Sequence, residues 1–138
     1  MMQPKPYAYA RKNVVECGAG DMLRDVARHL KNESVGSTLV KDSNGAYVGM
    51  LTEAIIFEAI AEGMEVEKLH VRDLKLMPYV SASKDAGFDE VMDIFNKNGV
   101  SRLAMTDEKG RVVGVLKKAN LDRFASYRMA STISSLKK

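Results

Sequence analysis

Side chains that commonly perform chemistry are few in this chain of 138 residues, and their spacing fits no catalytic arrangement. Cys17 is the only cysteine, so an intramolecular disulfide is impossible and a cysteine-based metal cluster is not expected. His29 and His70 each lack a second metal ligand at a useful spacing. No nucleophile stands with a base, and no strict glycine-rich phosphate loop occurs. The sequence therefore predicts a protein that is not an enzyme, with no catalytic residues and no metal site.

The overall composition is that of an ordinary globular protein, with 46% hydrophobic and 28% charged residues. No apolar run approaches the roughly 20 residues that a membrane-spanning helix needs, and residues 1–11 lack the apolar core of a secretory signal. The 21 basic residues are interleaved with 18 acidic ones, whereas a nucleic-acid binder usually concentrates its basic residues in a stripe. We therefore expect a cytoplasmic protein with no membrane partner.

The elements that must position any functional group repeat at an interval of 65 residues. Asp42 and Gly45 correspond to Asp107 and Gly110, and the apolar positions between and around them correspond as well. An internal period of this kind decides the architecture. One unit of this size would bury too little apolar surface to be stable alone, so two units are expected to pack together.

Each repeat has the pattern of a strand, a helix, two strands joined by a hairpin, and a second helix. In the first repeat, a strand over 13–15 precedes Asp21, which we expect to cap the first helix. Strands over 38–40 and 46–51 follow, and Gly45 supplies the positive φ of the turn. Spacings of three and four mark the inner helix faces: Leu23, Val26, Ala27 and Leu30 in the first helix, and Ile55, Ile56, Ala59 and Ile60 in the second, which starts near Thr52.

The second repeat has the same pattern, with strands over 103–105 and 111–116. Its helix faces are expected to carry Phe88, Val91, Met92 and Phe95, and then Leu121, Phe124 and Ala125 after a start near Lys117. The predicted fold class is α+β, with two pseudo-symmetric β-α-β-β-α repeats packed as one module. The predicted segments are a lead-in (1–12), repeat 1 (13–63), a linker (64–78), repeat 2 (79–125) and a C-terminal tail (126–138), whose order the sequence leaves open.

Several stretches carry a resemblance to a known family: Val100–Gly110, Val112–Leu116, Asp42–Gly45, Val48–Thr52 and the linker stretch Val71–Pro78. Over about 13–124 the chain resembles a tandem pair of cystathionine beta-synthase (CBS) domains, also called a Bateman module. The resemblance implies a regulatory sensor that binds AMP, ADP, ATP, S-adenosylmethionine or a related adenosine compound in a cleft between the repeats. It also implies a homodimer and an unidentified regulated protein as partner, with no cofactor beyond the regulatory ligand.

The family's ligand motif is Gly-x-x-Thr/Ser-x-x-Asp, in which the hydroxyl and the helix start meet phosphate and the acid meets the ribose. The first copy keeps Thr52 but has Ile55 at the ribose position, and an isoleucine accepts no hydrogen bond. The second copy has Lys117 in place of the hydroxyl and Asn120 at the ribose position. Two other interpretations stay open at this stage: Thr52 as a plain helix cap and Lys117 as a solvated lysine.

Three further positions complete the expected ligand-binding residues. Arg102 precedes the second strand of repeat 2, where a basic side chain can reach phosphate, and its counterpart in repeat 1 is Ser37. Backbone groups at Val15 and Val80 are expected to pair with the adenine edge. The two copies therefore predict unequal ligand capacity, with the better site at Asn120, Lys117 and Arg102.

Two other functions compete with the sensor. Because both motifs are altered, the chain could instead be a degenerate pair that acts as a dimerisation or protein-interaction scaffold without ligand. A weaker alternative is nucleic-acid binding through basic residues near the C-terminus (Lys117, Lys118, Arg123, Arg128 and the lysine-ended tail), for which binding would depend steeply on salt.

Overall fold

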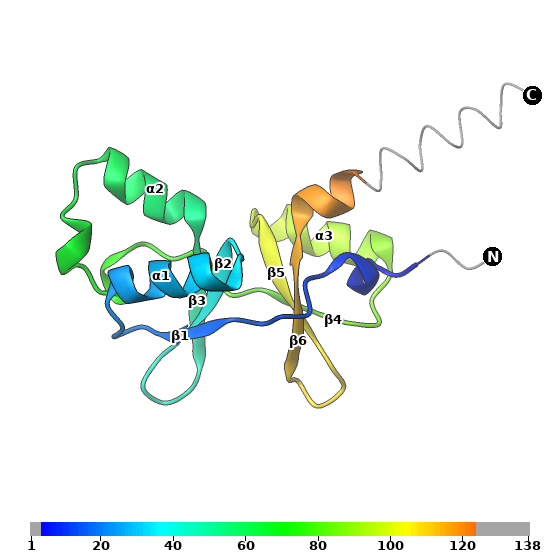
Figure 1. Cartoon of the computed structure of the whole chain (residues 1–138). Helices are drawn as coiled ribbons and strands as arrows, with labels where there is room; N and C mark the ends of the chain where they lie inside the picture. The colour runs from blue at the N-terminus through cyan, green and yellow to red at the C-terminus, as the bar shows by residue number, and fades with distance from the viewer. Residues whose placement is uncertain (1–3, 124–138) are drawn as a thin grey trace, which may run out of the picture. The chain divides into compact units, whose positions relative to one another are not determined.

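The computed structural model describes residues 4–123, which belong to two compact units (Figure 1). Unit 2 is a continuous stretch, Val14–Tyr79, whereas unit 1 combines the described parts of Met1–Asn13 and Val80–Lys138. Each unit contains one three-stranded sheet and its helices. The predicted α+β fold with two equivalent repeats is therefore confirmed. No helix within 4–123 is both long and apolar enough to cross a membrane.

The sheet of unit 2 has the order β1-β2-β3. Strands β1 and β2 run parallel because a helix connects them, and β2 pairs with β3 in an antiparallel hairpin whose turn uses Gly45 at φ 82°. Its elements are β1 (Glu16–Gly18), α1 (Leu23–Glu33), β2 (Ser37–Lys41), β3 (Tyr47–Thr52), α2 (Glu53–Ala61) and the short 3-10 helices η2 (Val66–Lys68) and η3 (Val71–Asp73).

Unit 1 repeats this topology with the order β4-β5-β6 and a hairpin turn at Gly110, at φ 78°. Its elements are the 3-10 helix η1 (Pro6–Tyr9), β4 (Ser81–Ser83), α3 (Phe88–Asn98), β5 (Arg102–Thr106) and β6 (Val112–Lys117). Residues 118–123 are helical after β6. The expected apolar positions at Phe124 and Ala125 and the tail 126–138 lie outside the described residues.

The cores of both units follow the predicted helical spacing. Helix α1 buries Leu23, Val26 and Leu30, and α3 buries Val91 and Phe95, each against its own sheet. The second helix differs from the prediction. It buries Ile56 and Ala59, but Ile60 is 54% exposed. Helix α2 leads away from the end of β3, so its last turn lies beyond the sheet that would cover it (Figure 1).

Two local predictions about the start of unit 2 are wrong. The first strand covers Glu16–Gly18 and not residues 13–15. Asp21 does not cap α1, whose N-cap is Met22 without a side-chain hydrogen bond. The Asp21 carboxylate instead accepts a hydrogen bond from the Gly18 amide at 2.8 Å, which closes the tight turn after β1. The Asp21 carboxylate therefore binds the Gly18 amide and not an amide of the first turn of α1.

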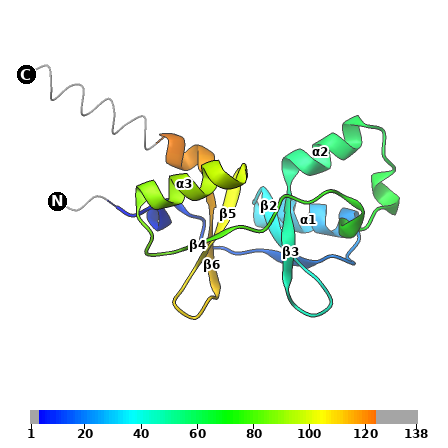
Figure 2. The ribbon, with the colours of Figure 1, turned by 180° about the vertical axis from the view of Figure 1, so that it is seen from behind.

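The segments that precede the first strands pack beside the third strands (Figure 2). Arg11 and Val115 of β6 exchange two backbone hydrogen bonds of 2.9 Å, and Met77 and Met50 of β3 exchange bonds of 2.8 and 3.0 Å. In each unit a glycine allows this approach. A Cβ at Gly49 would lie 2.9 Å from the Met77 carbonyl oxygen, and one at Gly114 would lie 3.0 Å from the Tyr7 ring. The lead-in thus packs on β6 of unit 1 and the linker on β3 of unit 2.

Candidate functional site

Two predicted cationic residues of unit 1 lie opposite each other where the β5–β6 ladder ends. Arg102 and Lys117 are direct partners in the antiparallel register. Residues paired in this way place their side chains on the same face of the sheet, and like charges in such a pair repel. Arg102 is half-buried and Lys117 is exposed. An anion held near both side chains would relieve this repulsion.

A cavity of about 490 Å³ lies beside this pair, within the size range of small-molecule sites. The buried side chains Phe95 and Val100 form its apolar floor, and Lys117 lies in its wall. Lys118 and Asp122 also line it and form an ion pair at 3.2 Å. The remaining lining residues are Asn96, Gly99, Ser101 and Ala119. The cavity therefore combines an apolar surface with a charged rim.

Of the expected ligand residues of unit 1, Lys117 lines this cavity, whereas Arg102, Asn120 and Val80 do not. Asn120 is half-buried and lies three residues after Lys117, in the first turn of helix 118–123. The Val80 carbonyl accepts a hydrogen bond of 2.9 Å from the Ala104 amide, just before β4. The structure therefore pairs Arg102 with Lys117, which lines the cavity, and places Asn120 one helical turn further along.

In unit 2 the equivalent positions have a different role. Thr52 pairs with Ser37 in the β2–β3 register, and it is only 4% exposed. Its hydroxyl oxygen accepts a hydrogen bond of 3.3 Å from the Ile55 amide, so Thr52 is the N-cap of α2. Thr52 therefore caps α2, as one of its two interpretations predicts. The Ile55 side chain is half-buried and packs against the apolar core, so this end of the sheet carries neither a cation nor a ribose acceptor.

The carbonyl groups expected to face adenine also differ between the units. The Val15 carbonyl accepts two hydrogen bonds, from the Leu39 amide at 2.9 Å and from the Thr38 hydroxyl at 3.2 Å. At the equivalent place in unit 1, Leu103 replaces Thr38, so the Val80 carbonyl lacks this second donor. A carbonyl oxygen has two lone pairs, and both are engaged at Val15.

A second groove, which the sequence did not reveal, lies in unit 2 between α1 and α2. Its volume is about 350 Å³, and its lining residues are Ala27, Leu30, Lys31, Ser34, Val35, Glu53, Ile56 and Phe57. Phe57 was not singled out from the sequence. It follows Ile55 and Ile56, and such an apolar run does not show which member lies outside the core. We refer to this feature as the α1/α2 groove.

Three ionisable side chains of unit 2 form a cluster on its sheet, outside the lining of the groove. Lys41 forms an ion pair with Glu16 at 2.8 Å, and the Tyr47 hydroxyl donates a hydrogen bond to the same carboxylate. Burial opposes ionisation of Glu16, but Lys41 and Tyr47 outweigh it and hold the pKa of Glu16 below its ordinary value. The Tyr47 ring also stacks on Tyr79, with ring centres 5.0 Å apart. This cluster therefore has the character of a structural ion pair.

The thiol and the histidines form no further site in the described part of the chain. Burial raises the pKa of the Cys17 thiol, which makes it a poor nucleophile. The Nδ1 atom of His70 lies 3.6 Å from a carboxylate oxygen of Asp73, at η3. Within residues 4–123 no three His, Cys, Asp or Glu side chains come close enough to hold a metal ion.

The family of this chain is shown by a match to a family model. The model of the CBS domain matches twice, over residues 7–62 and 71–126. The chain is a pair of CBS domains. Each match begins with the segment that packs beside a third strand, so the family unit includes the lead-in and the linker stretch.

Two curated relatives of this CBS pair match most of the chain at low identity. Protein MK0525 of Methanopyrus kandleri is 19% identical over 130 residues, which cover 94% of this chain and 66% of that protein. Inosine-5'-monophosphate dehydrogenase of Nitrosopumilus maritimus is 23% identical over 120 residues, 87% of this chain but only 24% of the dehydrogenase. The chain thus spans about two thirds of the first relative and about a quarter of the second.

Solved structures show the same fold. CBS domain protein TA0289 of Thermoplasma acidophilum has a TM-score of 0.72 and 24% identity, covering 89% of this chain and 70% of that one. The CBS domain pair of MJ0100, solved with 5'-methylthioadenosine and S-adenosyl-L-methionine, has a TM-score of 0.70 and 19% identity, covering 91% and 98%. PAE2072 of Pyrobaculum aerophilum, solved with AMP, has a TM-score of 0.68 and 14% identity, covering 85% and 89%.

Proposed function

We propose that this CBS pair is a non-catalytic regulatory module that binds an adenosine-containing ligand at the Arg102–Lys117 end of unit 1. The observation that carries the proposal is the direct pairing of these two cations beside a cavity of about 490 Å³. Such a pair attracts an anionic group, and the apolar floor at Phe95 and Val100 suits the rest of a nucleotide. Two proteins of the same fold bind AMP or S-adenosylmethionine-type compounds.

In this proposal each ligand residue of unit 1 has a separate task. Arg102 and Lys117 bind phosphate oxygens, Lys117 as a compact point charge and Arg102 as a planar fork. The Asn120 amide accepts or donates a hydrogen bond at the ribose, and the Val80 backbone meets the adenine edge. The CBS fold supports these assignments, and binding measurements on single variants decide them.

We further propose that the two units have unequal ligand capacity. In unit 2 the hydroxyl of Thr52 is buried and occupied by the cap of α2, and Ile55 offers no hydrogen bond. A ligand that depends on ribose and phosphate therefore loses its partners there. Val15 and Thr52 belong to the weaker site, which takes at most a ligand that depends less on ribose.

Isothermal titration of the full chain with AMP, ATP and S-adenosylmethionine tests the proposal. We expect one tight site per chain, and Asn120→Ala should weaken it by about 5- to 10-fold, as for the loss of one hydrogen bond. Arg102→Ala or Lys117→Ala should weaken a phosphate-bearing ligand by about 10- to 100-fold. Ile55→Ala and Lys109→Ala, an exposed hairpin position of unit 1, serve as controls and should change little.

Two outcomes of this titration contradict parts of the proposal. Two equivalent tight sites per chain would remove the asymmetry. If no adenosine compound raises the melting temperature, the scaffold function stands instead, because a ligand at 100 times its dissociation constant should add about 2.7 kcal/mol. The occupied cap of Thr52 is the observation that favours the scaffold.

We also propose that the chain forms a homodimer, that it reports its ligand to a regulated protein and that it works in the cytoplasm. The homodimer can be measured on the isolated chain. Nucleic-acid binding through Lys117, Lys118 and Arg123 stays a weaker alternative, and an affinity that does not change between low and moderate salt would remove it.

A further inference from the structure

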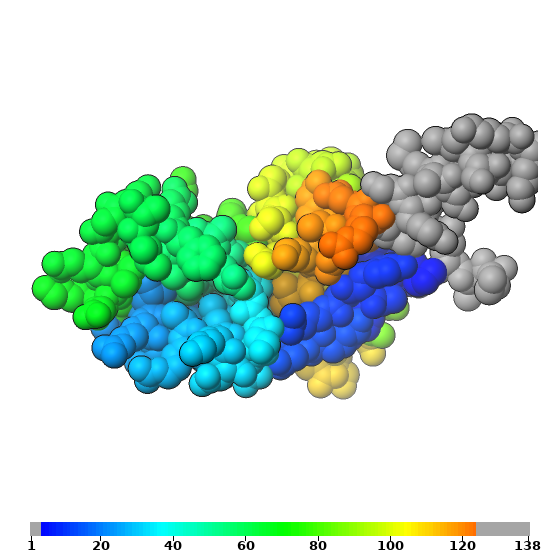
Figure 3. Space-filling model, turned by 45° about the horizontal axis from the view of Figure 1, so that its top comes forward, coloured from blue at the N-terminus to red at the C-terminus, as the bar shows by residue number. Residues whose placement is uncertain are grey.

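We infer that Tyr79 is a positioning residue for the ligand site of unit 1. Its ring stacks on Tyr47, and this stack fixes the backbone at Val80, which the proposed function assigns to the adenine edge. The inference rests on the proposed function and deepens it, because it names side chains of unit 2 that control the affinity of that site. Neither ring belongs to α1 or α2, the helices seen in blue and green in Figure 3.

The first reason is the course of the chain. Tyr79 is the last residue of unit 2, and Val80 is the next residue of unit 1. The Val80 carbonyl oxygen accepts a hydrogen bond of 2.9 Å from the Ala104 amide, within unit 1. The Tyr79 ring stacks on Tyr47 of unit 2, with ring centres 5.0 Å apart and an interplanar angle of 18°, and such pairs are stabilising. The two residues share a peptide bond, so the stack limits the conformations open to the Val80 backbone.

The second reason is that the Tyr47 ring is itself anchored by two other strands of its sheet. Its hydroxyl donates a hydrogen bond to the Glu16 carboxylate of β1. The Lys41 ammonium of β2 lies 5.1 Å from the centre of the same ring, and a cation over an aromatic face attracts it. Glu16 and Lys41 also bind each other at 2.8 Å. Tyr47 is therefore a fixed partner for the Tyr79 ring.

The third reason is that the residues before Tyr79 are restrained as well. Met77 exchanges backbone hydrogen bonds of 2.8 and 3.0 Å with Met50 of β3, and the ring of Pro78 fixes its own φ. Each residue of the stretch 77–80 therefore has its own restraint. Ordering a free backbone costs conformational entropy, so a ligand that binds a backbone already in place binds more tightly.

The stretch before Val15 has no such aromatic pair. At the interval of 65 residues, Val14 stands in place of Tyr79. In the other unit, Val112 stands in place of Tyr47. The stack is therefore specific to the approach to Val80, which belongs to the better of the two proposed sites. It gives a second physical reason for unequal ligand capacity, besides the altered ligand motifs.

Hydrogen exchange of the ligand-free chain tests the positioning role. The Ala104 amide bonds to the Val80 carbonyl, and its exchange should be about 5-fold faster or more in Tyr79→Ala. Tyr79→Phe keeps the ring and should exchange at nearly the wild-type rate. The Val115 amide, which bonds to the lead-in within the same unit, is the internal control and should not change. An Ala104 rate that Tyr79→Ala leaves unchanged overturns the inference.

Titration of the full chain with AMP and with S-adenosylmethionine tests the ligand role. Tyr79→Ala should weaken both compounds by a similar factor, about 5-fold, because both carry adenine. Tyr47→Ala removes the other ring and should have a similar effect, and the double variant should be little weaker than either single variant. Val48→Ala is the matched control, because Val48 is the neighbour of Tyr47 and is 46% exposed. This control should leave both affinities unchanged.

The results that contradict the inference differ from the one that contradicts the proposed function. If Tyr79→Ala binds AMP as tightly as the wild type, the inference is wrong and the proposed function stands. Losses that simply add in the double variant, or a loss in Tyr79→Phe as large as in Tyr79→Ala, also show that the stack is not the cause. A wild type that binds no adenosine compound removes the proposed function and the inference together.

Discussion

At the scale of single residues, several polar groups of this CBS pair already have partners within their own unit. Thr52, Asp21 and Glu16 each have a partner within unit 2: the Ile55 amide, the Gly18 amide and the Lys41 ammonium. Arg102 and Lys117 are register partners of like charge at the end of the β5–β6 ladder. Residue type alone does not reveal any of these pairings, because all of these residues are ordinary surface types.

Glu16 makes unit 2 sensitive to acid. Its pKa is lowered in the folded state, so the stabilisation is complete above the ordinary value of 4.5 and is lost as the pH falls through the folded value. We expect the melting temperature of the wild type to decline below about pH 4.5, and Glu16→Gln to flatten part of this decline. Thermal melts of both proteins between pH 3 and pH 7 measure this decline.

Glu108→Gln is the control for this experiment. Glu108 is exposed in the hairpin turn of unit 1, and within residues 4–123 it has no hydrogen bond or ion pair. Its replacement should leave the acid decline of the wild type unchanged. If Glu16→Gln and Glu108→Gln give the same pH profile, the Lys41–Glu16 pair contributes nothing measurable, as is common for exposed pairs.

At the scale of elements, glycines and caps set how strands and helices meet. Gly49 lies where the linker stretch packs beside β3. Next to it, Met50 and Met77 exchange two backbone hydrogen bonds. Thr52 is both the last residue of β3 and the N-cap of α2. Each of these positions depends on a contact with a second element, so a substitution there changes the packing of two elements together.

Gly49→Ala should destabilise unit 2 strongly. The added Cβ would lie 2.9 Å from the Met77 carbonyl oxygen, and a backbone atom cannot move aside as a side-chain tip can. We expect a loss of about 1–3 kcal/mol in the free energy of unfolding, as for overpacking of a core, measured by urea denaturation. Gly20→Ala is the control, since its Cβ would meet only the flexible end of Arg72, and a similar loss there would contradict this explanation.

Thr52→Ala should cost about 1 kcal/mol of stability through loss of the cap of α2. Thr52→Ser keeps a hydroxyl at the same place and should retain most of that stability. Urea denaturation compares the two variants, and titration with AMP in parallel separates the cap from a ligand role. Ligand binding that falls with Thr52→Ala as steeply as with Asn120→Ala would show that Thr52 takes part in the site.

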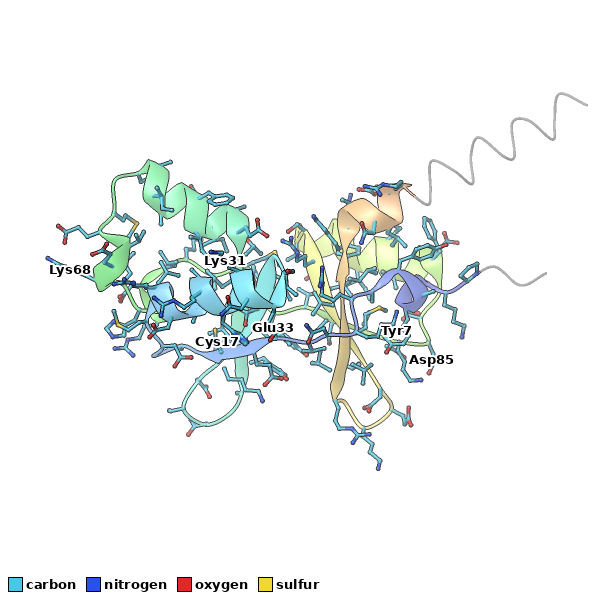
Figure 4. The ribbon with its side chains drawn as sticks, in the orientation of Figure 1. Tyr7, Cys17, Lys31, Glu33, Lys68 and Asp85 are labelled. Atoms are coloured by element: carbon cyan, nitrogen blue, oxygen red, sulfur yellow. The ribbon has the colours of Figure 1, made fainter. Side chains whose placement is uncertain are left out.

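At the scale of the whole molecule, the chain is not two consecutive blocks. Unit 1 needs the lead-in. Tyr7 of the lead-in (Figure 4) packs over Gly114 and donates a hydrogen bond of 3.1 Å to the Val113 carbonyl. Further along, Arg11 pairs with Val115 through backbone hydrogen bonds. Unit 2 is continuous and is held at its edge by the linker stretch. The stability of unit 1 therefore depends on residues far away in sequence.

Tyr7→Ala should loosen unit 1 selectively. We expect a loss of about 1–3 kcal/mol from the missing ring contacts and hydrogen bond, seen as faster hydrogen exchange of the β6 amides with little change in β3. Tyr7→Phe keeps the ring and should lose only about 1 kcal/mol. Equal acceleration in β3 and β6 would contradict the assignment of the lead-in to unit 1 alone.

The sequence by itself determined the repeat and most of the core, because apolar spacing and turn glycines act locally: Leu23, Val26 and Leu30 are buried as their spacing predicts. The family was indicated by the resemblance of its motifs and is shown by the match to the CBS domain model. Tertiary structure alone decided the features that depend on neighbours distant in sequence. It exposed Ile60 and Phe57 where α2 leads away from the sheet, and it brought the lead-in to β6. Helical periodicity shows which side chains share a face, but only the packed chain shows whether anything covers that face.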